Sequence, residues 1–418
     1  MRIVHLSTQD INGGAALAAY RLHRGLQRLG HESSMFVATR SSQDPTVIAY
    51  SPSNDFVSRV RRRLCRERIN RDFSHYHTSR PGGYEQFSDD RSCQGATILS
   101  QLPPCDLVTL HWVAGFMDYE AFFRNIPQQT PVVWRLADMN ALTGGCHYDH
   151  GCGKFMTGCG ACPQLGSTNC DDLSRKIWER KRTVFSSVNS SRLHIVALCK
   201  WMVELLKQSP LLSKFQVSLI PNGVDLENFA PRDRRLAREV LGIPQTVKVV
   251  MFVSDAMTNR RKGFTLLSKA LSSLSQDPSL FLVSVGSGKP EEPVPIPYLH
   301  LGQVTDDRWL SLIYSAADLF VIPSLQDNLP NTVLESMACG TPVVGFAVGG
   351  IPDMVRHGTT GLLALPHDVD GLRAAIEELL NDPVRRTELR ANCRRVAVEE
   401  YSREMQVRRY AELYKSLI

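Results

Sequence analysis

The chain has 418 residues, enough for two or three domains of about 150 residues each. Lys and Arg total 48 and Asp and Glu total 42, and the resulting net charge of +6 is too weak to predict binding to nucleic acid. The sequence shows neither an apolar run of about 18 residues nor an initial charged and apolar leader, so we expect a cytoplasmic protein whose 11 cysteines are reduced or bound to metal.

Short apolar segments alternate with helical segments along the first half of the chain. The apolar spacing of 15–29, closed by Gly30, predicts a helix. Buried strands are predicted at 3–6, 35–38, 107–110, 132–136, 195–198 and 217–220. This alternation is typical of a parallel, doubly wound sheet.

A second alternating series follows the turn Pro-Asn-Gly-Val-Asp at 221–225. Its strands are predicted at 248–253, 280–285, 319–322 and 342–346, and the tail from Asp370 is predicted to be almost wholly helical. We therefore predict an α/β protein of two Rossmann-like domains, 1–222 and 223–400, that face a ligand-binding cleft.

The densest motif runs from Asp327-Asn-Leu-Pro-Asn to Glu335 and continues into Gly340-Thr-Pro. The loop is expected to open a helix near Thr332, where free backbone amides suit polar or anionic ligand atoms. The carboxylates of Asp327 and Glu335 suit sugar hydroxyls. The alternative is an ordinary strand–helix unit whose acids only cap the helix.

Two further loops have features of phosphate sites. Arg260-Arg261-Lys262-Gly263 lies between a predicted strand and a predicted helix, so its cations suit a diphosphate; the alternative is a solvated basic loop. In Asn12-Gly13-Gly14 the glycines allow close approach of a ligand to the backbone, although a simple tight turn explains them equally well.

In family order, these motifs resemble those of retaining sugar-nucleotide glycosyltransferases of the GT-B fold, family 4 (glycosyl transferases group 1). The resemblance covers nearly the whole chain and implies that 401–418 crosses back onto the N-terminal domain. It implies catalytic roles for His111, Lys262 and Asp327. It implies donor binding by Gly13, Gly14, Arg261, Lys262, Asp327, Asn328, Leu329, Asn331 and Glu335.

The chain departs from the family pattern in places. Asp327 replaces a commoner glutamate, and Leu329-Pro330 replaces Phe-Gly, so one backbone donor is missing at the proline. An arginine usual before the Lys-Gly step is absent, and we expect Arg261 or Arg260 to substitute for it. His111 follows a predicted strand, where a lone histidine is often merely packed.

The resemblance implies transfer of a sugar from a UDP- or GDP-sugar to a lipid-linked or polysaccharide acceptor in surface or exopolysaccharide biosynthesis. The acceptor hydroxyl would attack the face from which the nucleoside diphosphate leaves, with no cofactor required for catalysis. The rival hypotheses are a sugar-nucleotide epimerase and a non-catalytic metal-binding scaffold on the same fold.

A cysteine-rich loop follows the predicted strand 132–136. Cys146, Cys152, Cys159 and Cys162 suit a structural zinc site, and free or redox-labile thiols or disulfides are the alternatives. The loop resembles that of a subgroup of exopolysaccharide transferases similar to those making colanic acid. Its expected position is on the acceptor side of the cleft, where Trp112 and Asp138 are candidate acceptor residues.

The segment 58–71 contains seven arginines. With Val57, Val60 and Leu64 on one helical face, it predicts a basic amphipathic helix that binds an anionic membrane surface. A solvated surface helix is the alternative.

Overall fold

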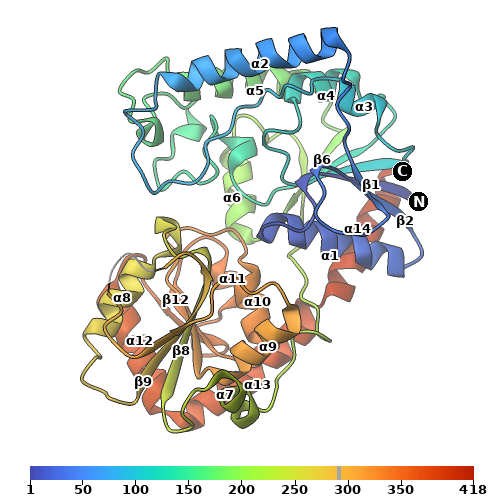
Figure 1. Cartoon of the computed structure of the whole chain (residues 1–418). Helices are drawn as coiled ribbons and strands as arrows, with labels where there is room; N and C mark the ends of the chain where they lie inside the picture. Colours follow the sequence, from blue (N-terminus) through green and yellow to red (C-terminus); the bar gives the residue numbers. More distant parts are fainter. Residues whose placement is uncertain (290–292) are drawn as a thin grey trace. The chain divides into compact units, whose positions relative to one another are not determined.

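The computed structural model describes residues 1–289 and 293–418. It divides into two compact units, which we call unit 1 (Met1–Ile220 with Val407–Ile418) and unit 2 (Pro221–Gln406). Each unit contains one parallel sheet, flanked by helices (Figure 1). The prediction of two parallel α/β domains is confirmed.

The sheet of unit 1 has the order β3-β2-β1-β4-β5-β6-β7. Its strands are β1 (Arg2–Gln9), β2 (Glu32–Thr39), β3 (Val47–Ala49), β4 (Leu107–Leu110), β5 (Val132–Arg135), β6 (Leu193–Ala197) and β7 (Gln216–Leu219). The chain starts at the centre with β1, moves to the β3 edge and returns to β4 beside β1. In parallel sheets such a reversal leaves space for a ligand beyond the carboxyl ends of the strands.

The helices of unit 1 connect these strands. They are α1 (Gly14–Arg28), α2 (Phe56–Ser74), α3 (Thr97–Ser100), α4 (Tyr119–Asn125), α5 (Leu173–Ser187) and α6 (Lys200–Gln208), with 3-10 turns at Asn140–Leu142, Lys154–Met156 and Pro163–Leu165. Asp118 and Asp172 cap α4 and α5 by accepting backbone hydrogen bonds. No residue of α2 is buried.

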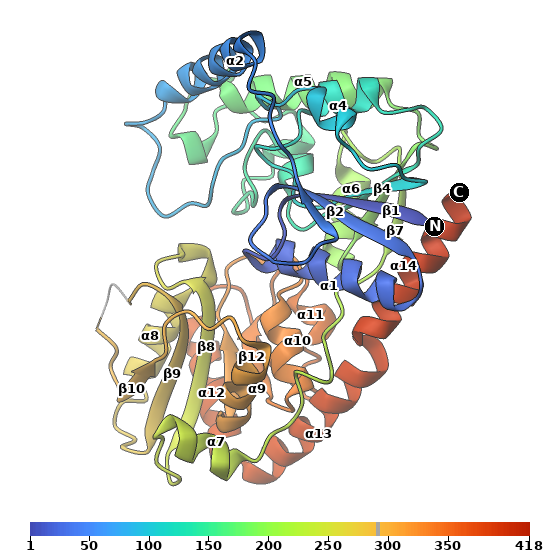
Figure 2. The ribbon, with the colours of Figure 1, turned by 45° about the vertical axis from the view of Figure 1, so that its right-hand side comes forward.

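The last helix, α14 (Arg403–Leu417), completes the core of unit 1. Its residues Val407, Tyr410, Ala411 and Tyr414 are buried against side chains of α1 and of strands β1, β4, β5 and β6. Gly25 of α1 permits this contact, because a Cβ there would stand 2.2 Å from Val407. Figure 2 shows α14 following α13 along the chain.

The sheet of unit 2 has the order β10-β9-β8-β11-β12-β13. Its strands are β8 (Lys248–Ala256), β9 (Leu280–Ser287), β10 (Tyr298–His300), β11 (Leu319–Ile322), β12 (Val343–Phe346) and β13 (Gly361–Ala364). Its helices are α7 (Arg234–Leu241), α8 (Phe264–Ser272), α9 (Asp307–Ala316), α10 (Asn331–Ala338), α11 (Ile351–Met354), α12 (Val369–Asn381) and α13 (Pro383–Glu400), with a 3-10 turn at Arg260–Lys262. The predicted helical tail is confirmed. None of the helices in the described parts of the chain combines the length and apolar character needed to cross a membrane.

Candidate functional site

Three of the expected donor-binding residues meet in unit 2, beyond the carboxyl ends of its central strands. Asp327 lies in the loop between β11 and α10, and its Oδ2 is 2.7 Å from Lys262 Nζ and 3.2 Å from Arg261 NH1. Arg261 and Lys262 form the 3-10 turn between β8 and α8. We call Arg261, Lys262 and Asp327 the ion trio.

Glycine makes this close arrangement possible. Gly263 has φ 73°, and a Cβ there would lie 1.9 Å from the carbonyl oxygen of Pro323. Gly349, after β12, has φ 54°, and a Cβ there would lie 1.8 Å from the carbonyl oxygen of Asp327. A side chain at either position would displace the backbone that carries the trio. The sequence analysis did not single out Gly349.

The ion trio is largely buried. Burial alone would raise the pKa of Asp327, but Lys262 and Arg261, together with the hydroxyl of Ser324, hold that pKa below its usual value. The side chain of Arg261 is 8% exposed and that of Lys262 is 19% exposed. Arg260 is exposed, whereas Arg261 forms an ion pair with Asp327. Which of the two substitutes for the missing family arginine stays a prediction.

The start of α10 carries the remaining candidate donor residues. The amide of Asn328 donates to Asp327 Oδ1 at 3.1 Å, and Leu329 is buried. The Asn331 side chain accepts a hydrogen bond of 2.9 Å from Asn222, a residue of the 221–225 turn for which the sequence analysis gave no role. Pro330 stands at the N-cap, where its missing N–H costs no helical hydrogen bond.

Glu335 lies on α10, where it is 5% exposed. The hydroxyl of Tyr314 donates to its Oε2 at 3.4 Å. Tyr314 is another residue that the sequence did not single out. An aromatic residue within a predicted helix usually packs in the hydrophobic core, so its sequence position gave no sign of a functional contact. This hydrogen bond from α9 fixes the position of the Glu335 carboxylate.

Gly13 and Gly14 belong to unit 1, at the start of α1. Gly13 is the N-cap with φ 90°, and both glycines are exposed. A Cβ on Gly13 would meet no atom within 4 Å, so its positive φ is the reason for glycine there. The exposed amides at this helix start can donate hydrogen bonds to an anionic ligand atom.

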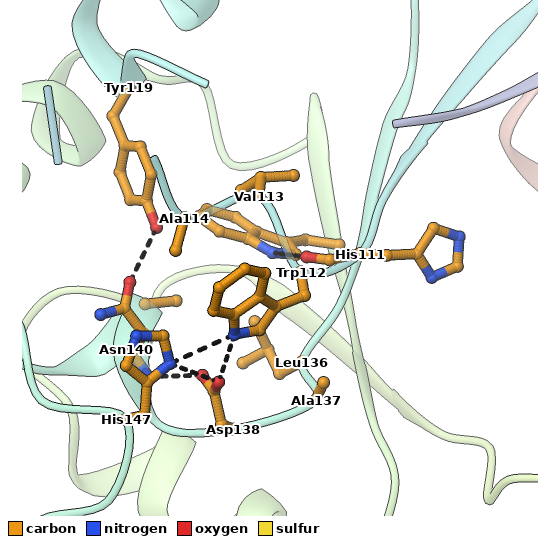
Figure 3. A pocket seen from close by; sticks show the side chains of 12 residues that line it. His111, Trp112, Val113, Ala114, Tyr119, Leu136, Ala137, Asp138, Asn140 and His147 are labelled. Atoms are coloured by element: carbon orange, nitrogen blue, oxygen red, sulfur yellow. Dashed lines mark hydrogen bonds and ion pairs between the residues drawn. The ribbon is translucent and has the colours of Figure 1, made fainter. Parts of the chain in front are cut away.

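His111 is buried beside a second histidine. His5 Nδ1 and His111 Nε2 are 2.9 Å apart, so one ring donates and the other accepts. Burial, with His23 and Arg135 nearby, lowers the pKa of both rings well below the usual value. His111 is therefore neutral at pH 7. In Figure 3 its ring points away from the pocket that its backbone helps to line.

The two candidate acceptor residues meet in that pocket. Trp112 Nε1 donates to Asp138 Oδ2 at 2.9 Å, and the same oxygen is 2.6 Å from His147 Nδ1 (Figure 3). The backbone amide of Asn140 donates to the other carboxylate oxygen, Asp138 Oδ1, at 2.9 Å. Burial raises the pKa of Asp138, but His147 and these donors outweigh burial and hold it below its usual value.

His147 extends this polar group away from the pocket, since its Nε2 lies 2.8 Å from Ser88 Oγ. Tyr119 and Trp134 add aromatic surface to the lining. These side chains are of the types that contact sugars, but the cavity volume of about 20 Å³ holds only water-sized groups. A sugar would therefore contact the rim, where Trp112 and Asp138 are half-buried. Sequence spacing gave no signal for Ser88 or Tyr119.

The four candidate metal ligands, Cys146, Cys152, Cys159 and Cys162, line one pocket of unit 1. Their thiols are free. In the described ranges, no group of three or more His, Cys, Asp or Glu is already gathered as a metal site.

Comparisons with known proteins match the segment that contains the candidate donor site. Residues 247–382, which contain the ion trio and α10, match the family model of glycosyl transferases group 1. A D-inositol 3-phosphate glycosyltransferase of Mycobacterium marinum is 35% identical over 179 residues, which are 40% of this chain and 37% of that protein. The chain thus spans well under two thirds of the length of this curated relative.

Solved structures match the whole chain. Sucrose-phosphate synthase from Thermosynechococcus elongatus aligns with a TM-score of 0.69 and 19% identity, over 100% of this chain and 99% of that one. Anabaena HepE, solved in complex with UDP-glucose, aligns with a TM-score of 0.67 and 16% identity, over 100% of both chains. Residues 247–382 are therefore similar to the glycosyl transferases group 1 family, and the fold of the chain is the GT-B fold of these solved glycosyltransferases.

Proposed function

We propose that the protein is a retaining glycosyltransferase that moves a sugar from a UDP- or GDP-sugar to a lipid-linked or polysaccharide acceptor in surface polysaccharide biosynthesis. The observation that carries the proposal is the ion trio: two cations converge beside the start of α10, inside the segment that matches the family. Such a site suits the diphosphate of a nucleotide sugar.

In this proposal the cations exchange partners during the reaction. Without donor, Asp327 neutralises Arg261 and Lys262. With donor, the cations bind the diphosphate and stabilise the charge that develops as the glycosidic bond breaks, while Asp327 accepts from sugar hydroxyls and Glu335 from ribose hydroxyls. The departing phosphate takes the proton of the acceptor hydroxyl, which attacks from the same face.

Neutral His111 suits a role as a hydrogen-bond partner of the sugar and not as a cation, because protonation of the buried ring is unfavourable. The pocket of Trp112, Asp138 and His147 is the proposed acceptor subsite in unit 1. HepE was solved with UDP-glucose, which supports a UDP-sugar as the first donor to test.

An inositol phosphate is a second candidate acceptor. The observation in its favour is the printed function of the Mycobacterium marinum relative. The match spans 40% of this chain, so the acceptor of that relative does not transfer without a test.

The test is turnover of a panel of UDP- and GDP-sugars, with a lipid diphosphate glycan and inositol 3-phosphate as alternative acceptors. Release of nucleoside diphosphate with one donor is expected, and Lys262→Ala should lower kcat by about 10²–10³-fold. Glu335→Ala should raise KM for the donor. Lys269→Ala, an exposed lysine on α8, is the matched control. NMR of the product reports the anomeric configuration.

Two outcomes contradict the proposal. Interconversion of a nucleotide sugar without any acceptor would identify an epimerase. Failure of every nucleotide sugar to bind or turn over would favour a non-catalytic scaffold.

A further inference from the structure

Four cysteines converge in the loops between β5 and α5. Cys146, Cys152, Cys159 and Cys162 line the same pocket, although 16 positions separate the first from the last. Cys170, on the same stretch of chain, is exposed and lies outside this lining. The fold therefore brings four cysteines to the lining of one pocket, although among the described residues their sulfurs are not gathered as a metal site, and it leaves a nearby fifth exposed.

Backbone amides are directed at three of the four sulfurs. A neutral thiol is a weak acceptor, whereas a thiolate bound to metal accepts N–H groups well and is oriented by them. The amide of Gly144 donates to Cys159 Sγ at 3.2 Å. Burial raises the pKa of Cys152 and of Cys162, whereas the amide of Lys154 acts to lower the first and the amides of Leu165 and Gln164 act to lower the second.

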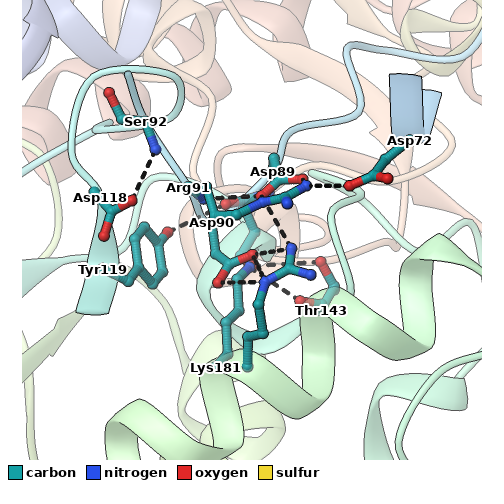
Figure 4. Close-up of polar contacts among 11 residues, drawn as sticks. Asp72, Asp89, Asp90, Arg91, Ser92, Asp118, Tyr119, Thr143 and Lys181 are labelled. Atoms are coloured by element: carbon teal, nitrogen blue, oxygen red, sulfur yellow. Dashed lines mark hydrogen bonds and ion pairs between the residues drawn. The ribbon is translucent and has the colours of Figure 1, made fainter. Parts of the chain in front are cut away.

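Two lysines place positive charge near the cluster. Lys181 is fully buried and donates to the carbonyl oxygens of Asn140 and Thr143 at 2.5 and 3.0 Å (Figure 4). Lys154 donates to the carbonyl oxygen of Ala161 at 2.6 Å. A divalent ion with four thiolates has a net charge of about −2, which two lysines offset.

We infer that Cys146, Cys152, Cys159 and Cys162 bind one structural zinc ion as a tetrahedral thiolate site. Each thiol releases its proton to solvent as its sulfur bonds to zinc, so no oxidant is needed. Four sulfur ligands favour zinc over magnesium or calcium. No described group is already gathered as a metal site, so the inference requires the four cysteine side chains to rotate toward one another when the ion binds.

The site has a consequence for the neighbouring acceptor pocket. Cys146 directly precedes His147, which contacts Asp138 at 2.6 Å. A zinc ion on Cys146 fixes the backbone that positions this imidazole. This part of the inference rests on the proposed function, whereas zinc binding itself does not.

The test measures zinc per chain in full-length protein purified without a metal-affinity tag and dialysed against chelator. About one zinc per chain is expected. A mercurial thiol reagent should release it after about four thiols have reacted, and cobalt should replace it with the near-ultraviolet absorption of cobalt–thiolate bonds. Cys159→Ser should lose the zinc and Cys170→Ser should retain it.

The thiol titration and cobalt replacement use the unmodified chain, so they decide the question even if Cys159→Ser fails to fold. Absence of metal with free thiols, two disulfides in place of thiols, or iron with visible absorption would each overturn the inference. Zinc without any turnover would retain the metal site and contradict only the proposed function.

Discussion

At the residue scale, the ion trio shows how burial concentrates electrostatic effects. Two cations share one oxygen of Asp327, whose side chain is 7% exposed. Removing one member of a buried ionic group leaves the others uncompensated, which costs more than the intact group contributes.

Asp327→Asn should therefore lower the free energy of unfolding of unit 2 by roughly 2–4 kcal/mol, because Arg261 stays buried while Lys262 reaches solvent. Urea denaturation at pH 7 measures this. Asp370→Asn, whose side chain is 92% exposed, should change it by less than about 0.5 kcal/mol. Equal effects of the two variants would show that the trio contributes nothing to stability.

The buried histidines predict a dependence of stability on pH. His5 and His111 have pKa values well below 6.5 in the folded state, so below that pH the unfolded chain binds more protons. Stability is then fully present above about pH 6.5 and falls as pH decreases, by about 1.4 kcal/mol per pH unit for each such histidine.

His5→Gln should reduce this slope by the contribution of one histidine, which is about 1.4 kcal/mol per pH unit. His75→Gln, at an exposed position, should leave the slope unchanged. Urea denaturation at pH 7, 6 and 5 gives the slope. An unchanged slope in His5→Gln would contradict the assignment of a neutral buried ring.

Several of the charged site residues could be predicted one by one from the sequence, but their ion pairs and hydrogen bonds with one another could not. The sequence indicated Asp327, Arg261 and Lys262 separately, yet the ion pairs join positions 65 and 66 residues apart. His5 was missed because its partner lies 106 residues away. A signal existed in retrospect: His5 lies on β1 and His111 directly follows the adjacent strand β4.

At the element scale, strands with fully buried apolar runs were predictable. β4, β5, β11 and β12 bury every residue, which gives a continuous apolar signal. The strands β3 and β10 lie at sheet edges and are three residues long and largely exposed. They carry no such signal, so they were missed. β13 was also missed, since Gly361 and Ala364 are residue types depleted in strands and leave only two strongly apolar residues between them.

Two tyrosines of α14 provide a matched pair. Thr109 Oγ1 donates to the hydroxyl of Tyr414 at 2.8 Å, whereas the hydroxyl of Tyr410 has no hydrogen-bond partner among the described residues. Tyr414→Phe should cost about 1–2 kcal/mol and Tyr410→Phe should be neutral or slightly stabilising. Thermal and urea unfolding of both variants measure the difference; the reverse order would contradict the hydrogen-bond assignment.

Helix α2 remains a proposed membrane-binding element. Phe56, Val57, Val60 and Leu64 are 78%, 66%, 39% and 60% exposed, and no residue of α2 is buried. The predicted apolar line is thus open to solvent beside the arginines. Basic side chains near an anionic lipid surface each contribute about 1 kcal/mol.

The protein should sediment with phosphatidylserine vesicles at low salt and release from them as salt increases. Replacing Arg59, Arg61 and Arg66 by serine should weaken binding by about 100-fold. Replacing three exposed cations of α14, Arg408, Arg409 and Lys415, is the control with the same charge change. Equal losses would indicate net charge alone, and no binding would reject the membrane role.

At the scale of the whole molecule, unit 1 is discontinuous in sequence, whereas unit 2 is one continuous segment. The alternating pattern predicted two α/β domains, but the return of the chain to unit 1 followed only from the family resemblance. Nothing in the amphipathic pattern of α14 says which sheet its apolar face covers, because many apolar surfaces accept a helix equally well.

Removing 407–418 should unfold unit 1. The lost burial of Val407, Tyr410, Ala411 and Tyr414 is worth about 5–8 kcal/mol, comparable to the whole stability of a domain. Limited proteolysis should then degrade unit 1 and leave a fragment of unit 2. Deleting only Ile418, which is 60% exposed, should have little effect. Persistence of a protease-resistant unit 1 after the larger deletion would contradict this account.

The placement of α14 also orders events during synthesis. Most of unit 1 leaves the ribosome early, but its closing helix emerges only after all of Pro221–Gln406 has been translated. At usual elongation rates that interval is roughly 10–40 s. During it, the apolar surface around Leu22, Leu26 and Val133 has no cover, so nascent chains stalled within unit 2 should be substrates for chaperones even though seven strands have already been made.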